Sequence, residues 1–270
     1  MKKIPQLISL LIVLYFPLVT HASDSNCPRI ISQSPYITGM LNYLGMGQCI
    51  VGVSRYSKLT LPHTGGILDP DAEAIDSVMP DFFITSDWTS PETIKNVIPD
   101  YTKSIRLKSF NTMAQLENNM NDIIKATGWH QSADKIKYFS AAWRDKVKQV
   151  KGNSKKVLLL SSCGGTPYSF GPNSRLYDLF TQAGFKVVET GEKIRHIKLG
   201  QDIEHITALL DRYQPDFLFT FEQGLNKQCQ LLTPKVPVRI ITFNGKDFLH
   251  PTVAILNGLD ALISKKHSWQ

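Results

Sequence analysis

Residues suited to binding a ligand recur directly after short apolar segments of this sequence. Serine, arginine, tyrosine and tryptophan stand at these places, as in Ser34-Pro35-Tyr36 and Asp87-Trp88. Aromatic rings combined with a few polar groups suit a large, partly apolar ligand. The predicted ligand-binding residues are Ser34, Tyr36, Arg55, Tyr56, Gly66, Trp88, Thr166, Tyr168, Ser169, Glu222 and Asn244. The alternative interpretation is that the aromatic rings only fill the space between two parts of the fold.

The same segments lack the motifs of hydrolases and of nucleotide-binding proteins. Ser169 has no glycine two positions before it, which the nucleophile elbow of many hydrolases requires. Gly164-Gly165 is not followed by the Lys-Ser/Thr pair of a phosphate-binding loop. We therefore predict no catalytic residue and no cofactor, and we interpret the chain as a binding protein rather than an enzyme.

The histidines offer an alternative kind of site, a directly bound metal ion. A zinc or manganese site needs three or four convergent histidine or carboxylate side chains. His63, His196 and His250 are the candidates for such convergence, but the sequence contains no His-x-x-x-His pair to support it. Surface or core positions explain these histidines more simply, and we predict no metal site.

Short strand-like segments alternate with amphipathic segments, which predicts parallel sheets covered by helices on both faces. The expected strands are residues 29–34, 50–54, 82–85 and 103–107 in the first half, and 156–161, 185–189, 217–221 and 238–243 in the second. Asp69 and Pro70 have the residue types of a helix N-cap and a first helical position. Ligands bind beyond the carboxyl ends of strands in such sheets, where the predicted binding residues lie.

The two halves of the chain resemble each other. Residues 79–85, MPDFFIT, are similar to residues 214–220, QPDFLFT, and the elements around them follow in the same order. A match this short arises by chance in many proteins, but the matching order makes duplication of one α/β lobe the better interpretation.

A long helix is expected between the halves, after a shorter one over residues 112–126. Residues 132–151 contain neither glycine nor proline, and their apolar residues recur at helical spacing. A 20-residue helix is about 30 Å long, enough to run along two lobes. We predict two Rossmann-like α/β lobes with parallel sheets, joined by this rigid interdomain helix. The expected boundaries are 1–22 for a signal peptide, 23–110 for the first lobe, 111–152 for the linker and backbone helix, and 153–270 for the second lobe.

The N-terminus has the features of a secretory signal peptide. Lys2 and Lys3 precede an apolar run over residues 7–19, and Thr20-His21-Ala22 provides small residues for cleavage. A membrane-spanning helix needs about 20 apolar residues, so an uncleaved anchor is the less favoured alternative. We expect cleavage after Ala22 and a protein of the periplasm.

Charge and cysteines add two further expectations. The 30 lysines and arginines exceed the 23 acidic residues, but they are spread along the chain, so we expect no nucleic-acid partner. Export makes the four cysteines candidates for disulfides. Of the three possible pairings we favour Cys27–Cys49 and Cys163–Cys229, because each pair then lies within one lobe. The absence of Cys-x-x-Cys argues against a thiol oxidoreductase or a structural zinc site.

Several motifs together resemble periplasmic binding proteins for vitamin B12 and ferric siderophores. Residues 29–38 (RIISQSPYIT), Leu44-Gly45 and residues 50–56 (IVGVSRY) are similar to the opening of these proteins. Gly65-Gly66, residues 70–73 and residues 79–81 resemble the next segment, and residues 165–171 resemble the start of the second lobe. The likeness covers nearly all of residues 28–264, and the first-lobe motifs are specific only as a set.

The resemblance implies the same two-lobed fold and a role in transport. Such proteins deliver a metal chelate, which is a corrinoid, a haem or a ferric siderophore, to an ABC permease in the inner membrane, and we expect a monomer. An acidic residue on each lobe docks onto arginines of the permease. Glu73 matches on the first lobe and Glu204 on the second, with Asp202 as the alternative to Glu204.

One departure from the family bears on the ligand. The B12-binding members carry a tryptophan in the loop that corresponds to residues 63–67, and this chain has none there. Trp88 and Tyr56 remain candidates to flank a corrin or porphyrin ring, while Arg55 and Lys58 are candidates to meet carboxylates of haem, citrate or a siderophore. Two other functions stay open: a periplasmic receptor that signals instead of delivering, and a periplasmic hydrolase.

Overall fold

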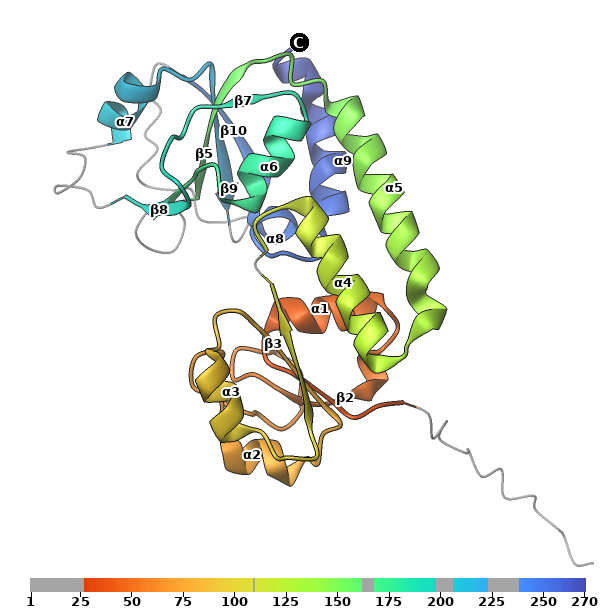
Figure 1. The fold of residues 1–270 in the computed structure, drawn as a ribbon. Coiled ribbons are helices and arrows are strands. Elements are labelled where there is room, and N and C mark those ends of the chain that lie inside the picture. The colour runs from red at the N-terminus through yellow and green to blue at the C-terminus, as the bar shows by residue number, and fades with distance from the viewer. Residues whose placement is uncertain (1–26, 109, 162–167, 198–205, 223–237) are drawn as a thin grey trace, which may run out of the picture.

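The protein consists of two α/β lobes held on one side by a pair of long helices (Figure 1). The computed structural model describes residues 27–108, 110–161, 168–197, 206–222 and 238–270. The predicted signal peptide, residues 1–22, lies outside the described residues. The lobe that contains strands β1 to β4 is called the first lobe, and the lobe that contains β5 to β10 is called the second lobe.

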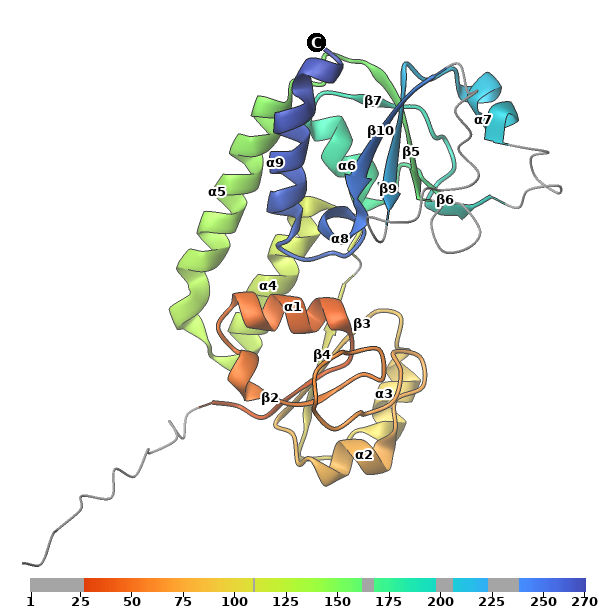
Figure 2. The same ribbon diagram turned by 180° about the vertical axis from the view of Figure 1, so that it is seen from behind.

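The first lobe is a four-stranded parallel sheet in the order β2-β1-β3-β4. Its strands are β1 (Ile30–Ser32), β2 (Ile50–Val53), β3 (Phe82–Ser86) and β4 (Lys103–Leu107). Its helices are α1 (Pro35–Tyr43), η1 (Gly47–Cys49), α2 (Ala72–Ser77) and α3 (Pro91–Val97). Helix α1 covers one face, and α2 and α3 cover the other (Figure 2). Because successive strand residues point to opposite faces, Ile30 packs with the α1 side and Ile31 with the α2 side.

The second lobe has a six-stranded sheet in the order β10-β9-β5-β6-β8, with β7 also paired to β5. Its strands are β5 (Lys156–Ser161), β6 (Tyr168–Phe170), β7 (Lys186–Val187), β8 (Ile194–His196), β9 (Phe217–Glu222) and β10 (Arg239–Asn244). Strands β10, β9, β5 and β7 are parallel, as predicted, whereas β6 and β8 extend the sheet in antiparallel fashion. The sequence did not predict these two strands, because three residues are too few to show an alternating pattern.

Helices cover both faces of the second sheet (Figure 1). They are α6 (Arg175–Gln182), α7 (Ile206–Tyr213), α8 (Gly245–Phe248), α9 (Ile255–Lys265) and η3 (Lys266–Ser268). Helices α6, α8 and α9 pack on the face toward the long helices, where Phe219, Phe221 and Phe243 are buried. Helix α7 packs Leu209 and Leu210 on the opposite face.

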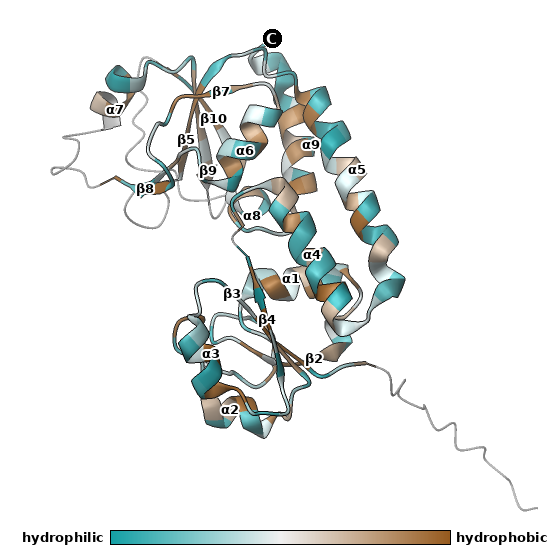
Figure 3. Cartoon of the chain, in the orientation of Figure 1, coloured by the Kyte–Doolittle hydropathy of each residue, from teal (hydrophilic) through white to brown (hydrophobic). Residues whose placement is uncertain are grey.

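The two long helices are α4 (Met113–Thr127) and α5 (Ala133–Val150), joined by η2 (His130–Ser132). At 1.5 Å per residue, the 18 residues of α5 span about 27 Å. The buried side of α5 consists of Ile136, Phe139, Trp143, Val147 and Val150. Its spacing of three and four residues confirms the predicted helix, and the outward side is hydrophilic (Figure 3). We call α4 and α5 together the spine.

The spine is bonded to the first lobe at one end. The Tyr43 hydroxyl donates to the Lys135 carbonyl at 2.7 Å, and the Tyr43 ring lies edge-on to Phe139 at 6.2 Å between centroids. The Trp129 indole N–H donates to the carbonyl of Leu44 at 3.2 Å. These contacts join the end of α1 to the start of α5.

The spine is bonded to the second lobe at its other end. Lys146 on α5 forms an ion pair with Asp260 on α9, and the Trp269 indole N–H donates to the Val150 carbonyl at 3.4 Å. One apolar cluster of buried residues runs from α1 through α5 to α9. The lobes therefore share a continuous core through the spine, in agreement with a stiff rather than a flexible connection.

The segments predicted to be duplicated have the same local structure. Met79 and Gln214, each just before a proline, have positive φ angles of 42° and 43°. Asp81 then accepts a hydrogen bond from the Arg29 amide at 2.7 Å, and Asp216 accepts one from the Lys156 amide at 2.8 Å. In each lobe this carboxylate ties the third strand of the repeat to the start of its first strand.

Two details near the first sheet test the sequence predictions. The helix expected to be capped by Asp69 begins at Ala72 instead, because the Asp71 carboxylate accepts from the Ala74 amide at 3.1 Å and caps it. The Cys27–Cys49 disulfide is present, with 5.4 Å between Cα atoms, which confirms that pairing. The predicted Cys163–Cys229 disulfide lies outside the described residues.

Candidate ligand-binding site

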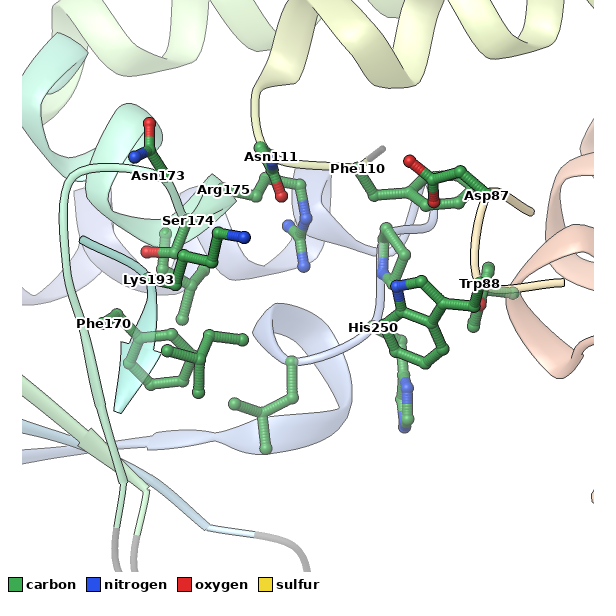
Figure 4. A pocket seen from close by; sticks show the side chains of 15 residues that line it. Asp87, Trp88, Phe110, Asn111, Phe170, Asn173, Ser174, Arg175, Lys193 and His250 are labelled. Atoms are coloured by element: carbon green, nitrogen blue, oxygen red, sulfur yellow. The ribbon is translucent and has the colours of Figure 1, made fainter. Parts of the chain in front are cut away.

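A pocket of ≈ 560 Å³ lies between the two lobes. Its volume is within the range of small-molecule sites. The first lobe and the start of the spine contribute Tyr36, Asp87, Trp88, Phe110 and Asn111. The second lobe contributes Phe170, Asn173, Ser174, Arg175, Leu176, Lys193, Ile194, Leu249, His250 and Pro251. Figure 4 shows Asp87 and Trp88 entering from one side, Phe170 and Lys193 from the other, and Arg175 between them.

Aromatic rings form the first-lobe side of this pocket. Tyr36 is held at the start of α1, because the Ser34 hydroxyl accepts from the Ile37 amide at 3.3 Å and caps the helix. The Tyr36 ring lies edge-on to Phe110 at 5.0 Å and to Trp88 at 6.4 Å. Burial raises the pKa of Tyr36 above its ordinary value, so this ring stays neutral at physiological pH. Trp88 follows β3 and is 65% exposed, which leaves most of its indole free for contact.

A buried cation forms the second-lobe side. Arg175 is the first residue of α6, after the N-cap Ser174, and only 6% of it is exposed. Its Nη2 donates to the Phe248 carbonyl at 2.6 Å, while its Nη1 is buried and has no hydrogen-bond partner among the described residues. Burial lowers the pKa of Arg175 to about 10, although Asp178 partly offsets this, so the side chain remains a cation at neutral pH.

Other charged and titratable groups line the same pocket. Lys193 adds a second cation from the segment before β8, and Asp87 supplies a carboxylate from the opposite side. Burial, and secondly the charge of Arg175, lower the pKa of His250, so this imidazole is neutral at physiological pH. Excess positive charge on the second-lobe side makes the pocket suitable for an anion.

Some predicted binding residues line the pocket and others support it. Tyr36 and Trp88 line it. Tyr168 packs against Phe170 at 5.4 Å between ring centroids, directly behind a lining residue. Asn244 accepts from the Lys246 amide at 3.1 Å and so caps α8, which precedes His250.

Ser169 belongs to a buried polar cluster rather than to the pocket lining. Its hydroxyl donates to Glu189, which also accepts from the Tyr213 hydroxyl at 2.6 Å, from the Gly191 amide at 2.9 Å and from Arg195 at 3.0 Å. Burial raises the pKa of Glu189, but these hydrogen bonds and the Arg195 charge outweigh it and hold the pKa below its ordinary value. The cluster fixes β6, β8 and α7 to one another.

Three predicted binding residues lie on the outer loops of the first lobe. Arg55 forms an ion pair with Asp69 at 2.7 Å, and Tyr56 is exposed. The Gly66 carbonyl accepts from the Gln33 side chain at 2.8 Å. None of the three is among the residues that line the interlobe pocket. Their assignment to the ligand stays a prediction.

Most of the remaining predicted residues have no described side chain, and Glu73 is the exception. Thr166 and Glu204 lie outside the described residues, and so do Cys163 and Cys229. Glu222 ends β9, but its side chain is not among those described. Glu73 is exposed in the first turn of α2, where a carboxylate also complements the helix dipole.

The predicted alternative of a directly bound metal is not supported by the described residues. His63 bridges to Val53 on the first lobe, His196 lies on β8 beside Tyr168, and His250 lines the pocket. Within the described ranges, no group of three His, Cys, Asp or Glu side chains is placed to hold a metal ion.

The serine that lines the pocket, Ser174, donates its hydroxyl hydrogen bond to the Gly171 carbonyl at 2.7 Å, so its hydroxyl proton is engaged with the backbone.

The sequence analysis missed Arg175, Lys193 and Phe110 as pocket residues. Arg175 is buried at the first position of a helix, where a positive charge opposes the helix dipole, but the sequence alone shows neither the exact helix start nor the burial. In the structure, a buried cation that its own helix disfavours is a candidate functional residue. Phe110 and Lys193 carried no sequence signal either, because only the chain path brings them to the pocket.

The fold defines the class of protein that this chain resembles. The same fold occurs in solved structures of periplasmic haem- and vitamin B12-binding proteins and of a petrobactin-binding protein. A periplasmic haem-binding protein from Pseudomonas aeruginosa has a TM-score of 0.69 and 19% identity, covering 89% of this chain and 93% of that chain. The vitamin B12-binding protein of Vibrio cholerae has a TM-score of 0.71 and 16% identity, covering 90% and 98%.

A petrobactin-binding protein from Bacillus subtilis has a TM-score of 0.66 and 15% identity, covering 88% of this chain and 92% of that chain. At these identities the likeness establishes the fold. Comparison with protein-family models gives no match, and no curated protein sequence matches significantly. Among the described helices, none has both the length and the apolar character to cross a bilayer.

Proposed function

We propose that this protein is a periplasmic solute-binding protein that captures a metal chelate between its two lobes and delivers it to an ABC permease. The observation that carries the proposal is the interlobe pocket, to which both lobes contribute side chains. Its aromatic side suits the apolar face of a large planar ligand, and its cationic side suits polar substituents. The solved structures with this fold include proteins for haem, vitamin B12 and a siderophore.

Capture requires the lobes to move around the spine. Helix α5 is hydrogen-bonded to the first lobe at Lys135 and to the second lobe at Val150, and an apolar core runs between these points. A large hinge rotation would break this core, so closure consists of a small rocking of one lobe against the other. Small-angle scattering with and without ligand tests this, and a large drop in radius of gyration would contradict it.

Delivery requires a surface that the permease recognises. Glu73 is exposed on α2 and is not among the residues that line the interlobe pocket. Helix α2 lies at the end of the first lobe that is away from the second lobe (Figure 1). Glu73 is proposed to dock onto arginines of the permease together with Glu204. A monomer presents one such face to the membrane, and cleavage of the signal peptide after Ala22 releases the protein into the periplasm.

The direct test of capture is to purify the protein from its native cell envelope and to record its absorption spectrum and metal content. Corrins, haems and ferric catecholates absorb at different wavelengths, so one spectrum identifies the class. The proposal predicts a stoichiometric chromophore or one that is regained on titration. A protein that neither contains nor binds any of these chelates would contradict it.

The test of delivery is the double variant Glu73→Ala with Glu204→Ala. We expect unchanged chelate affinity, because Glu73 lies outside the pocket, and loss of uptake in cells. Glu92→Ala is a matched control, because Glu92 is also exposed in the first turn of a helix of the same lobe. Loss of affinity in the double variant, or equal loss of uptake with Glu92→Ala, would refute the docking assignment.

A further inference from the structure

We propose that Arg175 binds a carboxylate of the ligand, so that the ligand is an anionic metal chelate with an apolar face and at least one carboxylate group. This inference rests on the proposed function, because it concerns the same interlobe pocket. It assigns a binding role to a residue that the sequence had not indicated, and it narrows the three chelate classes to those that carry a carboxylate.

The guanidinium group of Arg175 is incompletely hydrogen-bonded. A guanidinium group has five N–H donors, and in a buried position each unpaired donor is costly. Nη2 is paired with the Phe248 carbonyl, but Nη1 has no partner, and the described residues provide no ion pair for this arginine. A ligand carboxylate in the pocket would satisfy both the charge and the free donors.

The local structure at the start of α6 does not require an arginine at position 175. The positive charge opposes the dipole of α6, and burial removes most of its hydration. The one bond to Phe248 is a bond to a neutral carbonyl, which a neutral glutamine can also make. The buried charge therefore destabilises the ligand-free protein. Charged groups that are destabilising in this way are frequent at binding sites, where the ligand supplies the missing partner.

The side chain of Arg175 is directed toward the space between the lobes (Figure 4). Figure 4 shows the guanidinium of Arg175 directed into the pocket, with Lys193 on the same side and Asp87 on the opposite side. This arrangement orients an anionic ligand, because its carboxylates are attracted to the second lobe and repelled by Asp87. The planar fork of arginine also matches the two oxygens of a carboxylate.

The two sides of the pocket together define the chemical class. Tyr36, Trp88 and Phe110 offer apolar ring surface, and Arg175 offers a buried cation. An iron porphyrin with carboxylate side chains has both complementary features. A corrinoid with amide side chains lacks the carboxylate and would leave Arg175 unpaired.

The experiment changes the ligand and the protein separately. Equilibrium titration compares iron(III) mesoporphyrin IX with its dimethyl ester, which keeps the ring and removes the carboxylate charge. The proteins are the wild type, Arg175→Gln and Arg239→Gln. Arg239 is the matched control, because it also donates to a backbone carbonyl of the second lobe, that of Ser268 at 2.8 Å, but lies outside the pocket.

We expect the wild type to bind the acid about 10- to 100-fold more tightly than the ester, the range of a charge-assisted hydrogen bond. Arg175→Gln should lose this preference, and Arg239→Gln should keep it. The comparison of acid and ester on the wild type alone needs no variant, so a folding defect in Arg175→Gln, which thermal unfolding would reveal, leaves the proposal testable.

Equal binding of acid and ester by the wild type would overturn the inference and leave the proposed function standing, because a chelate is still bound. The same holds if cyanocobalamin binds more tightly than the porphyrin acid. Binding of none of the porphyrins, cyanocobalamin, ferric citrate and a ferric catecholate would overturn the proposed function itself, and the inference with it.

Discussion

The two lobes are built alike at one end and differ at the other. At the start of the strands, the carboxylates of Asp81 in the first lobe and Asp216 in the second each accept a hydrogen bond from a backbone amide, and each aspartate lies two residues after a residue with positive φ. At the pocket, the first lobe presents aromatic rings and the second presents the cations Arg175 and Lys193. The strand ends are therefore built alike in the two lobes, while the segments that line the pocket differ.

This difference teaches where binding specificity resides in such a fold. The repeated features are hydrogen bonds from a backbone amide to an aspartate carboxylate at the start of the strands, and they satisfy backbone donors of the sheet. The features that differ between the lobes are side chains on loops and at helix starts. Such side chains contribute little to the stability of the fold, so they can vary between proteins that bind different ligands.

The largest expected effect concerns the spine that joins the lobes. Trp143→Ala should lower the free energy of unfolding by about 3–5 kcal/mol, because a buried indole is lost and a cavity remains. Both lobes should lose stability together in one transition, measured by urea denaturation. Tyr138→Ala on the exposed side of the same helix should change it by less than about 0.5 kcal/mol. Two separate transitions in the wild type would show that the lobes are independent.

The next effect concerns the buried polar cluster of the second lobe. Glu189 is 0% exposed and accepts from four partners, so Glu189→Gln should cost about 2 kcal/mol at neutral pH. Because its folded pKa lies below the ordinary 4.5, the ionised cluster stabilises fully above pH 4.5 and is lost as pH falls through the folded pKa. The difference between wild type and variant should therefore shrink below pH 4.5.

Thermal unfolding over a pH series measures this difference. Glu192→Gln is the control, because Glu192 is exposed in the same segment and should shift stability by less than about 0.5 kcal/mol. A cost for Glu189→Gln that does not vary between pH 7 and pH 3 would mean that the carboxylate charge is not what holds the cluster.

A smaller effect tests the aromatic side of the pocket. Trp88→Ala should weaken porphyrin binding about 10-fold, roughly 1.4 kcal/mol, because stacking area is lost. Stability should change little, since the indole is 65% exposed. Tyr138→Ala removes an equally exposed ring outside the pocket and should not affect binding. Lost stability with unchanged affinity would show that Trp88 only fills the space between the lobes.

The smallest effect tests the repeated ends of the lobes. Met79→Gly and Gln214→Gly should each stabilise the protein by about 0.5–1 kcal/mol, because glycine adopts positive φ without steric cost. Both side chains are exposed, so no packing is lost. Similar changes in melting temperature are expected for both, and opposite signs would contradict the structural equivalence of the two segments.

Sequence reasoning identified the features that depend on local pattern. The apolar spacing of α5, the Cys27–Cys49 pair and the alternation of parallel strands with helices all follow from residues close in the chain or from a repeated order of elements. The helix start at Asp69 was wrong by two residues, because two aspartates near one proline both have capping chemistry. Asp71 caps the helix, while Asp69 pairs with Arg55.

The pocket was harder to predict because it depends on the path of the chain. Arg175 follows a serine that caps a helix, a place that shows no sign of burial until Phe248 and His250 are folded against it. Phe110 reaches the pocket only because β4 leads directly into the spine. Arg55, in contrast, has a residue type suited to carboxylates but an acidic neighbour that already binds it.

A crystal structure of the protein saturated with its native chelate, with the metal located by anomalous scattering, tests the binding site most directly. We expect one metal position in the interlobe pocket, with the chelate ring against Trp88 and a carboxylate on Arg175. A metal position outside this pocket, or a chelate bound to one lobe alone, would contradict this expectation.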